Sequence, residues 1–335
     1  MSKKMITTPK RQLTFIVDLN KCIGCQTCTV ACKKLWSTAP GQEFMYWRNV
    51  ETTPGLGYPK NWQSKGGGYK NGMLQDNGHR PTLDEYGVPF KYDFAARLFE
   101  GKKGGVVPSP EPRWSPNWDE EQGIGEYPNN IFAFLPRMCN HCTNPACVEA
   151  CPTDSIYVRA EDGLKIVNLE TCAGVQECIK ACPYGKIYFN ETDKKSNKCI
   201  GCYPRIEKGV ATACVAQCVG RAMHVGFIDD VNSSVYKLSK LWKVAMPLHP
   251  EFGTEPNVLY IPPFVGPAMQ DEKGNMMMTQ KMPLDLLQGL FGSKVGDVLS
   301  VLKAERAKKI AGKNSELMDI MIGEFSDSMM ISPMT

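Results

Sequence analysis

Short apolar strands separated by turn residues dominate the hydrophobic pattern in the middle of the chain. Residues 153–158 and 164–169 each have the pattern of a strand, and the polar turn at residues 161–163 joins them. Two further apolar strands are expected at residues 187–189 and 223–228. The pattern therefore predicts small hairpins in this part of the chain.

The last third of the chain has a different pattern. Residues 260–263 are expected to be extended, and residues 284–311 have the periodicity of a helix. Apolar side chains recur there at i, i+3, i+4 and i+7, namely Val295, Val298, Leu299 and Leu302. No apolar run reaches the roughly 18 to 20 residues of a transmembrane helix, so no membrane span is expected.

Residues 33–138 lack both periodicities. They contain 14 of the 30 glycines, 11 of the 24 prolines and five of the six tryptophans (Trp36, Trp47, Trp62, Trp114 and Trp118). So much Gly and Pro predicts an irregular segment, whereas the aromatic content argues against a disordered linker. The rings either form part of this protein's own core or contact a partner.

The charge balance excludes one class of partner. Lys plus Arg is 39 and Asp plus Glu is 35, which gives a formal net charge of +4. This small excess gives no electrostatic basis for binding nucleic acid. The composition, with 22% charged and 42% hydrophobic residues, is that of a globular protein.

The fifteen cysteines all fall in four short motifs. The first reads C-x2-C-x2-C-x3-C, the bacterial iron–sulfur run, and the second reads C-x2-C-x4-C-x3-C-P. The third reads C-x5-C-x3-C-P, and the fourth reads C-x2-C-x11-C-x3-C. The motifs are Cys22, Cys25, Cys28, Cys32; Cys139, Cys142, Cys147, Cys151; Cys172, Cys178, Cys182; and Cys199, Cys202, Cys214, Cys218.

These spacings favour iron–sulfur clusters over three alternatives. Zinc explains paired C-x2-C but neither the first motif nor the repeated C-P ending. Disulfides cannot use an odd number of cysteines, and no motif has the C-x3-C-x2-C order of a radical-SAM enzyme. A loop with tightly spaced thiolates can surround one cluster, while the last cysteine of the run points to another.

The third motif lacks one ligand. When it is aligned on the ferredoxin run, Val175 occupies the position of the second cysteine. A valine side chain cannot bind iron, so three thiolates remain and a [3Fe–4S] cluster is expected. A cubane with water or a distant ligand at the open corner is the alternative.

The spacing between motifs predicts which of them pair. The second and third are separated by about the distance found inside a two-cluster ferredoxin, and the first and fourth both begin Cys-Ile-Gly-Cys. Crossed ligation then uses every thiolate. Cluster one takes Cys22, Cys25, Cys28 and Cys218; cluster two takes Cys32, Cys199, Cys202 and Cys214; cluster three takes Cys139, Cys142, Cys147 and Cys182; cluster four takes Cys151, Cys172 and Cys178.

The predicted fold is α+β, with two bacterial-ferredoxin-like modules that each hold two clusters. Residues 11–32 plus 190–230 form module A with clusters one and two, and residues 139–189 form module B with clusters three and four. Residues 33–138 are the irregular insertion, and residues 231–335 are a C-terminal arm that contains the helix. His141 lies inside a cysteine loop and has either a structural role or a hydrogen bond to a cluster. Six basic residues flank the motifs and either offset cluster charge or lie in solvent, namely Lys21, Lys33, Lys34, Lys186, Lys198 and Arg205.

Nearly the whole chain resembles the four-cluster beta subunit of type II molybdenum enzymes in the dimethyl sulfoxide reductase family. This group includes nitrate, selenate and (per)chlorate reductases and dimethylsulfide, ethylbenzene and steroid C25 dehydrogenases. The segments that carry the resemblance are Cys22-Ile-Gly-Cys25-Gln-Thr-Cys28, Asn49-Val-Glu-Thr-Thr-Pro-Gly, Leu135-Pro-Arg-Met-Cys139-Asn-His-Cys142, Cys182-Pro-Tyr-Gly-Lys-Ile-Tyr-Phe and Cys199-Ile-Gly-Cys202-Tyr-Pro-Arg-Ile-Glu.

The resemblance implies an electron-transfer subunit without bond-making chemistry of its own. It would link a molybdopterin-containing alpha subunit, next to cluster one, to a haem b gamma subunit or a soluble cytochrome, next to cluster four. The expected assembly is a periplasmic heterotrimer, exported with the alpha subunit; a cytoplasmic location is the alternative. A free polyferredoxin and a catalytic iron–sulfur subunit remain the other two function classes.

Overall fold

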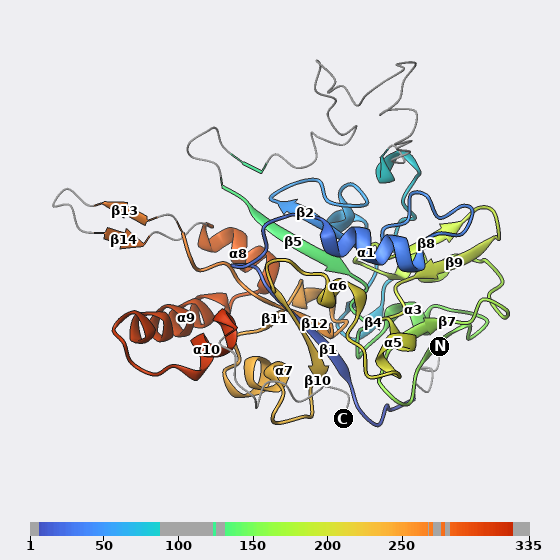
Figure 1. Ribbon diagram of the computed structural model, residues 1–335. Helices are drawn as coiled ribbons and strands as arrows, with labels where there is room; N and C mark the ends of the chain where they lie inside the picture. Colours follow the sequence, from blue (N-terminus) through green and yellow to red (C-terminus); the bar gives the residue numbers. More distant parts are fainter. Residues whose placement is uncertain are drawn as a thin grey trace, which may run out of the picture.

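A four-stranded sheet lies at the centre of the protein. The computed structural model describes residues 7–87, 123–124, 131–266, 268–270, 276–278 and 282–323. The fold is mixed α/β with open sheets, and the central sheet has the order β10-β1-β12-β11 (Figure 1). Its strands are β1 (Leu13–Asp18), β10 (Met223–Phe227), β11 (Met246–Pro247) and β12 (Val258–Ile261).

Strand β1 lies between β10 and β12 in this sheet, and all six of its residues are buried. It pairs antiparallel with β10 and parallel with β12, so that Phe15 is opposite both Val225 and Val258. A strand that is buried on both faces has a continuous apolar sequence instead of an alternating one. The range expected as a C-terminal arm therefore also contributes two strands, β11 and β12, to the sheet that contains β1.

Two hairpins follow the cysteine motifs in the middle of the chain. The predicted strands appear as β6 (Ile156–Val158) and β7 (Lys165–Val167), joined by a turn in which Gly163 N donates to Arg159 O at 3.0 Å. The strands expected near residues 187–189 and 223–228 are β8 (Ile187–Asn190) and β10. Strand β9 (Lys195–Lys198), which pairs with β8, has a polar sequence that gave no strand signal.

The cysteine motifs lead into short helices. The longest is α1, and the others form a single turn or slightly more. These helices are α1 (Thr27–Trp36), α3 (Ala146–Glu149), α4 (Glu177–Ala181), α5 (Tyr203–Ile206) and α6 (Ala213–Ala216).

The described part of the insertion contains one longer ribbon among short elements. Strands β2 (Arg48–Thr53) and β5 (Ala133–Met138) pair antiparallel over their full length. The other elements are η1 (Trp62–Ser64), β3 (Tyr69–Lys70), β4 (Met73–Leu74) and η2 (Asp84–Tyr86). Trp47 and Trp62 are buried in the protein's own core, whereas Trp114 and Trp118 lie outside the described residues.

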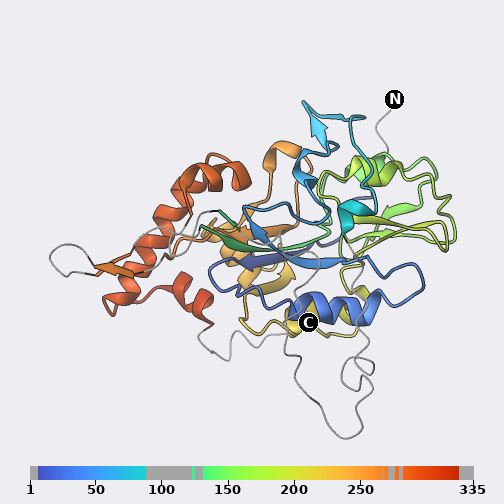
Figure 2. The same cartoon turned by 90° about the horizontal axis from the view of Figure 1, so that it is seen from above.

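Helices at one end of the molecule pack on the sheet. The helical pattern expected over residues 284–311 is divided into α8 (Leu284–Phe291) and α9 (Val295–Ile310), because the chain turns at Gly292 with φ +82°. A third helix, α10 (Glu316–Ile322), follows them. The buried apolar side chains of all three helices belong to the same core as those of β1 and β12. Figure 2 shows these helices at the opposite end from the β6–β9 hairpins.

The remaining elements are short. They are α7 (Ser234–Tyr236), η4 (Lys237–Leu241), η5 (Pro250–Phe252) and the paired strands β13 (Ala268–Gln270) and β14 (Met276–Met278). No helix in the described part of the chain has both the length and the apolarity needed to cross a membrane.

Candidate metal centres

One cavity is lined by cysteines from both ends of module A. The loop after β1 provides Cys22 and Cys25, the first turn of α1 provides Cys28, and Cys218 comes from the segment after α6. Burial, together with the charges of Cys28 and Cys218, raises the pKa of the Cys22 thiol to about 11. The chain therefore brings these four sulfurs together across almost 200 residues of sequence.

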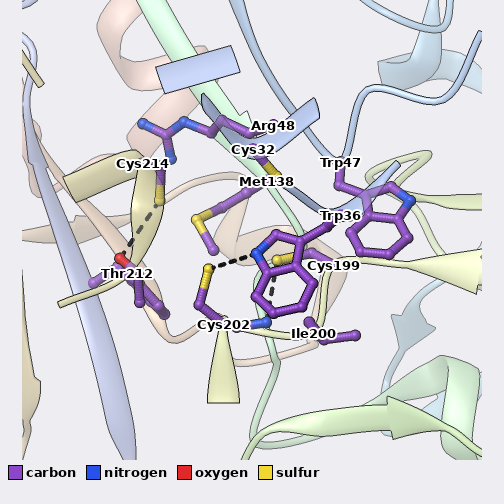
Figure 3. A pocket seen from close by; sticks show the side chains of 12 residues that line it. Cys32, Trp36, Trp47, Arg48, Met138, Cys199, Ile200, Cys202, Thr212 and Cys214 are labelled. Carbon is purple, nitrogen blue, oxygen red and sulfur yellow. Dashed lines mark hydrogen bonds between the residues drawn. The ribbon is translucent and has the colours of Figure 1, made fainter. Parts of the chain in front are cut away.

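A second cavity lies one helical turn further along α1. Its cysteines are Cys32, Cys199, Cys202 and Cys214 (Figure 3). Burial raises the pKa of Cys32, and so do the charges of Cys214 and Cys202. The indole Nε1 of Trp36 donates to Cys202 Sγ at 3.1 Å, and the backbone N of Gly201 donates to Cys199 Sγ at 3.3 Å. Hydrogen bonds to sulfur are one way in which a protein tunes the potential of a cluster.

A third group of cysteines comes from the second and third motifs. Burial raises the pKa of Cys142 to about 12, together with the charges of Cys139 and Cys182. The pKa of Cys147 is raised well above its ordinary value by burial and by the charge of Cys182. The structure thus brings together the four cysteines expected around cluster three.

The fourth group has three members. Burial raises the pKa of Cys178 to about 12, and the charges of Cys151 and Cys172 act in the same direction. The Cys178 thiol also donates to Ser196 Oγ on β9 at 3.5 Å. These are the three cysteines expected around cluster four.

The loop of the third motif has the same backbone form as that of the first. Gly24 and Gly174 have φ of +69° and +71°, and the next-but-one residues, Gln26 and Gln176, have φ of 57° and 67°. Each glutamine precedes a helix, α1 or α4. Val175 therefore occupies the position on its loop that Cys25 occupies on the first, and both side chains are exposed.

The four groups form a connected series. Cys28 and Cys32 are one turn apart on α1, a rise of about 6 Å, and so belong to neighbouring cavities. Cys178 on α4 and Cys182 immediately after it connect the fourth and third groups in the same way. Between these two halves, the charge of Cys139 helps to raise the pKa of Cys199, after burial and the charge of Cys32.

Arg48 and Lys198 are buried cations that lie among the cysteines. Arg48 on β2 lines both of the first two cavities, and Lys198 on β9 donates to the carbonyl oxygens of Lys165 and Cys199. Of the basic residues that flank the motifs, Lys186 and Lys198 are buried, whereas Lys34 is exposed. Sequence reasoning missed Arg48 because it lies in the irregular insertion, far from any cysteine in the sequence.

His141 is a buried, neutral side chain. Burial lowers its pKa well below the ordinary value, and the charges of Lys198 and Lys165 lower it further. The backbone N of Lys165 donates to Nδ1 at 3.1 Å, so Nε2 carries the proton of the neutral ring. This Nε2 has no hydrogen-bond partner in the described structure.

These features fit a multi-atom inorganic cluster better than a single ion. Within the described ranges, no three Cys, His, Asp or Glu side chains converge closely enough to hold one metal ion. The cysteines instead surround cavities, and Nε and Nη1 of Arg48 and Nε2 of His141 are buried without a partner. Sulfide and thiolate sulfur would accept hydrogen bonds from such donors.

Comparison with known proteins agrees with this chemistry. Residues 131–228 match the model of a 4Fe-4S dicluster domain. The chain is 65% identical over 331 residues to the perchlorate reductase subunit beta of Dechloromonas aromatica, which covers 99% of both chains. This chain belongs to the family of iron–sulfur beta subunits of molybdoenzyme reductases.

Other members of this family are similar over most of their length. The selenate reductase subunit beta of Thauera selenatis is 53% identical, over 94% of this chain and 97% of its own. The respiratory nitrate reductase subunit beta of Haloferax mediterranei is 46% identical, over 92% of this chain and 90% of its own. In this family, a beta subunit implies a catalytic molybdopterin alpha subunit as partner, and the resemblance seen in the sequence is confirmed.

Proposed function

We propose that this chain is the electron-transfer subunit of a molybdoenzyme and carries three [4Fe–4S] clusters and one [3Fe–4S] cluster in series. The observation that supports this most directly is the grouping of its fifteen cysteines into sets of four, four, four and three. The proposed ligands are Cys22, Cys25, Cys28 and Cys218; Cys32, Cys199, Cys202 and Cys214; Cys139, Cys142, Cys147 and Cys182; and Cys151, Cys172 and Cys178.

The way the helices are shared supports the proposed two-module arrangement. Helix α1 packs against α6, and each connects a cysteine of the first cavity with one of the second. Helices α3 and α4 pack together in the same way between the third and fourth groups. This is the crossed ligation of two-cluster ferredoxins, repeated once.

The proposed [3Fe–4S] cluster rests on Val175. Because its loop has the backbone form of the first motif, a cubane here would present one iron to an apolar side chain that cannot bind it. Loss of that iron leaves a three-iron cluster that three thiolates can hold.

The ends of the series reach the surface at apolar positions. Near Cys25, the side chains of Ile23 and Val219 are 60% and 67% exposed. On the fourth group, Val175 and Leu169 are 49% and 46% exposed. Exposed apolar side chains at both ends suit two different protein partners.

The partners we propose are those of the family. A molybdopterin alpha subunit would contact the end with cluster one, and a haem b gamma subunit or a soluble cytochrome would contact the end with cluster four. The complex would be a periplasmic oxyanion reductase, or a hydrocarbon or steroid dehydrogenase that uses the same series in the opposite direction. A free polyferredoxin is the less favoured alternative, because the relatives are subunits of larger enzymes.

The chain's own residues would act by holding and tuning the clusters, which accept and release single electrons. Trp36 and the backbone N of Gly201 donate to cysteine sulfurs of the second cavity, and the backbone N of Ala222 donates to Cys218 Sγ at 3.3 Å. Most of the cysteines are buried or half-buried, which limits contact with water. Hydrogen bonds to sulfur and exclusion of water would each shift the reduction potential of a cluster without changing its iron ligands.

Chemical analysis of the anaerobically purified complex tests the proposal. This chain should contribute about 15 iron atoms and about 16 acid-labile sulfides to the complex, in addition to any iron that its partners hold, since three clusters have four irons, one has three, and each has four sulfides. The oxidised protein should give the EPR signal of a [3Fe–4S] cluster. Little iron, or a chain that elutes alone at its monomer mass of 37.3 kDa, would contradict the assignment.

A further inference from the structure

Arg48 is a buried cation without a carboxylate partner in the described structure. Its side chain is 2% exposed, and its guanidinium Nε and Nη1 have no hydrogen-bond partner. Its Nη2 contacts the Sδ of Met223 at 2.6 Å, and the side chain also forms a hydrogen bond with Cys28. A buried charge without a compensating group is strongly destabilising. Some other negative charge is therefore expected beside Arg48.

The position of Arg48 identifies that charge. Arg48 is the only cation in the described structure that lines both the cavity of Cys22, Cys25, Cys28 and Cys218 and the cavity of Cys32, Cys199, Cys202 and Cys214. Figure 3 shows its side chain reaching past Cys32 toward Cys214.

We propose that Arg48 is a positioning residue shared by clusters one and two, which stabilises the reduced form of both and so raises both reduction potentials. The inference rests on the proposed function, because it requires clusters in these two cavities. It adds a role for a residue of the insertion that contributes no ligand.

The physical basis is the charge added on reduction. Each electron makes a cluster more negative, and a fixed positive charge nearby favours that state more strongly in a low-dielectric interior than in water. Arg48 cannot lose its proton at any working pH, so the effect does not vary with pH. Because one guanidinium lies beside both cavities, it raises the reduction potentials of both clusters, and its removal should lower both.

Lys198 is a second buried cation whose expected effect on the clusters can be compared with that of Arg48. It is buried, it donates to the carbonyl of Cys199 on cluster two, and the charges of Cys139 and Cys147 on cluster three act on it. By the same reasoning it should act on clusters two and three instead of one and two. The two cations therefore have overlapping but different expected targets.

The test is an EPR-monitored redox titration of the full chain in its complex. In Arg48→Met, which keeps the length of the side chain but not its charge, we expect lower midpoint potentials for clusters one and two and unchanged potentials for clusters three and four. Arg48→Gln is a second neutral variant in case the methionine prevents folding. Arg48→Lys restores a charge and should bring both potentials back toward those of the parent protein.

Two further variants serve as controls. Lys34→Met removes an exposed cation from α1, where solvent screens the charge, and should move no potential. Lys198→Met should lower the potentials of clusters two and three only. If the neutral Arg48 variants keep their iron and their potentials, or if Arg48→Lys shifts them as far as methionine does, the proposal is wrong. Absence of iron from the parent protein would instead overturn the proposed function.

Discussion

At the scale of single residues, Val175 distinguishes the loop of the third cysteine motif from that of the first, which has Cys25 at the same position. Its neighbours Gly174 and Gln176 have the same left-handed backbone as Gly24 and Gln26 in the first motif. The loop is thus already shaped to present a side chain at this position toward a cluster. Only the chemistry of that side chain differs.

Val175→Cys should therefore restore a fourth thiolate without remodelling the loop. We expect a [4Fe–4S] cluster in place of the [3Fe–4S] cluster, and a lower reduction potential at that site because a thiolate adds negative charge. EPR of the oxidised protein and a redox titration measure both changes. Val301→Cys places a cysteine at another partly exposed valine, on α9, and should leave the three-iron signal intact; an unchanged signal in Val175→Cys would contradict the prediction.

The sequence predicted the cysteine groups and pointed to His141 and Lys198 beside them, but it did not predict Arg48. Spacing within a motif is local, so the sets that share a cavity could be inferred from the motifs and the crossed-ligand rule. Arg48 reaches the same cavities from β2, a strand in a Gly- and Pro-rich segment, and only the three-dimensional pairing of β2 with β5 places it there. The orphaned Nε2 of His141 likewise depends on a long-range bond from Lys165.

At the scale of elements, the turn before α1 packs the first cysteine motif against strand β5. Gly24 has φ +69°, and a Cβ added there would lie 2.6 Å from Cε1 of Phe134 on β5. Glycine is required for both reasons, since the backbone is left-handed and the ring of Phe134 leaves no space. The loop of cysteines and the β2–β5 ribbon are therefore in direct contact.

Gly24→Ala should disturb cluster one through that contact. Gly209 provides a matched control, because it has the same φ of +69° with no heavy atom within 4 Å of an added Cβ. Gly209→Ala should cost only the backbone strain, about 1 kcal/mol. Gly24→Ala should cost about 1 to 3 kcal/mol more through overpacking and should lower the iron content at cluster one. If Gly24→Ala and Gly209→Ala had equal unfolding free energies and equal iron content, the predicted effect of the Phe134 contact would be contradicted.

The same scale shows where elements could be predicted from sequence. Strands β6, β8 and β10 have short apolar runs with clear boundaries, and they appear where expected. The division of the C-terminal helix at Gly292 was missed, because the apolar periodicity continues across the break. Strand β9 was missed because its polar side chains, including Ser196 and Lys198, are buried for their contacts with cysteines and carbonyls.

At the scale of the whole molecule, the cysteines are part of the core. The main core includes Cys28, Cys32, Cys139, Cys199 and Cys214 together with residues of β1, β12 and the C-terminal helices. A smaller core contains Cys151 and Cys178. The clusters would therefore lie inside the folded protein, and their binding free energy would contribute to folding.

Removal of iron should destabilise the chain most strongly around the motifs. With raised pKa values, buried thiols such as Cys32 and Cys142 stay protonated at neutral pH without iron, so Arg48 and Lys198 lose their negative partners. We expect the iron-free chain to lose amide exchange protection in α1 and α4 while α9, which carries no cysteine, keeps more of it. Hydrogen exchange of the anaerobic chain before and after chelation measures this; equal protection in both states would show that the clusters are not structural.

The parallel pairing of β1 with β12 has a consequence for biosynthesis. Strand β1 and the segment from Cys22 to Cys32 leave the ribosome well before the cysteines from Cys199 to Cys218 and strand β12. The ligands of the third and fourth groups, from Cys139 to Cys182, emerge within one continuous stretch. Clusters three and four could thus form before clusters one and two, because the cysteines from Cys22 to Cys32 need partners that are made after Cys182.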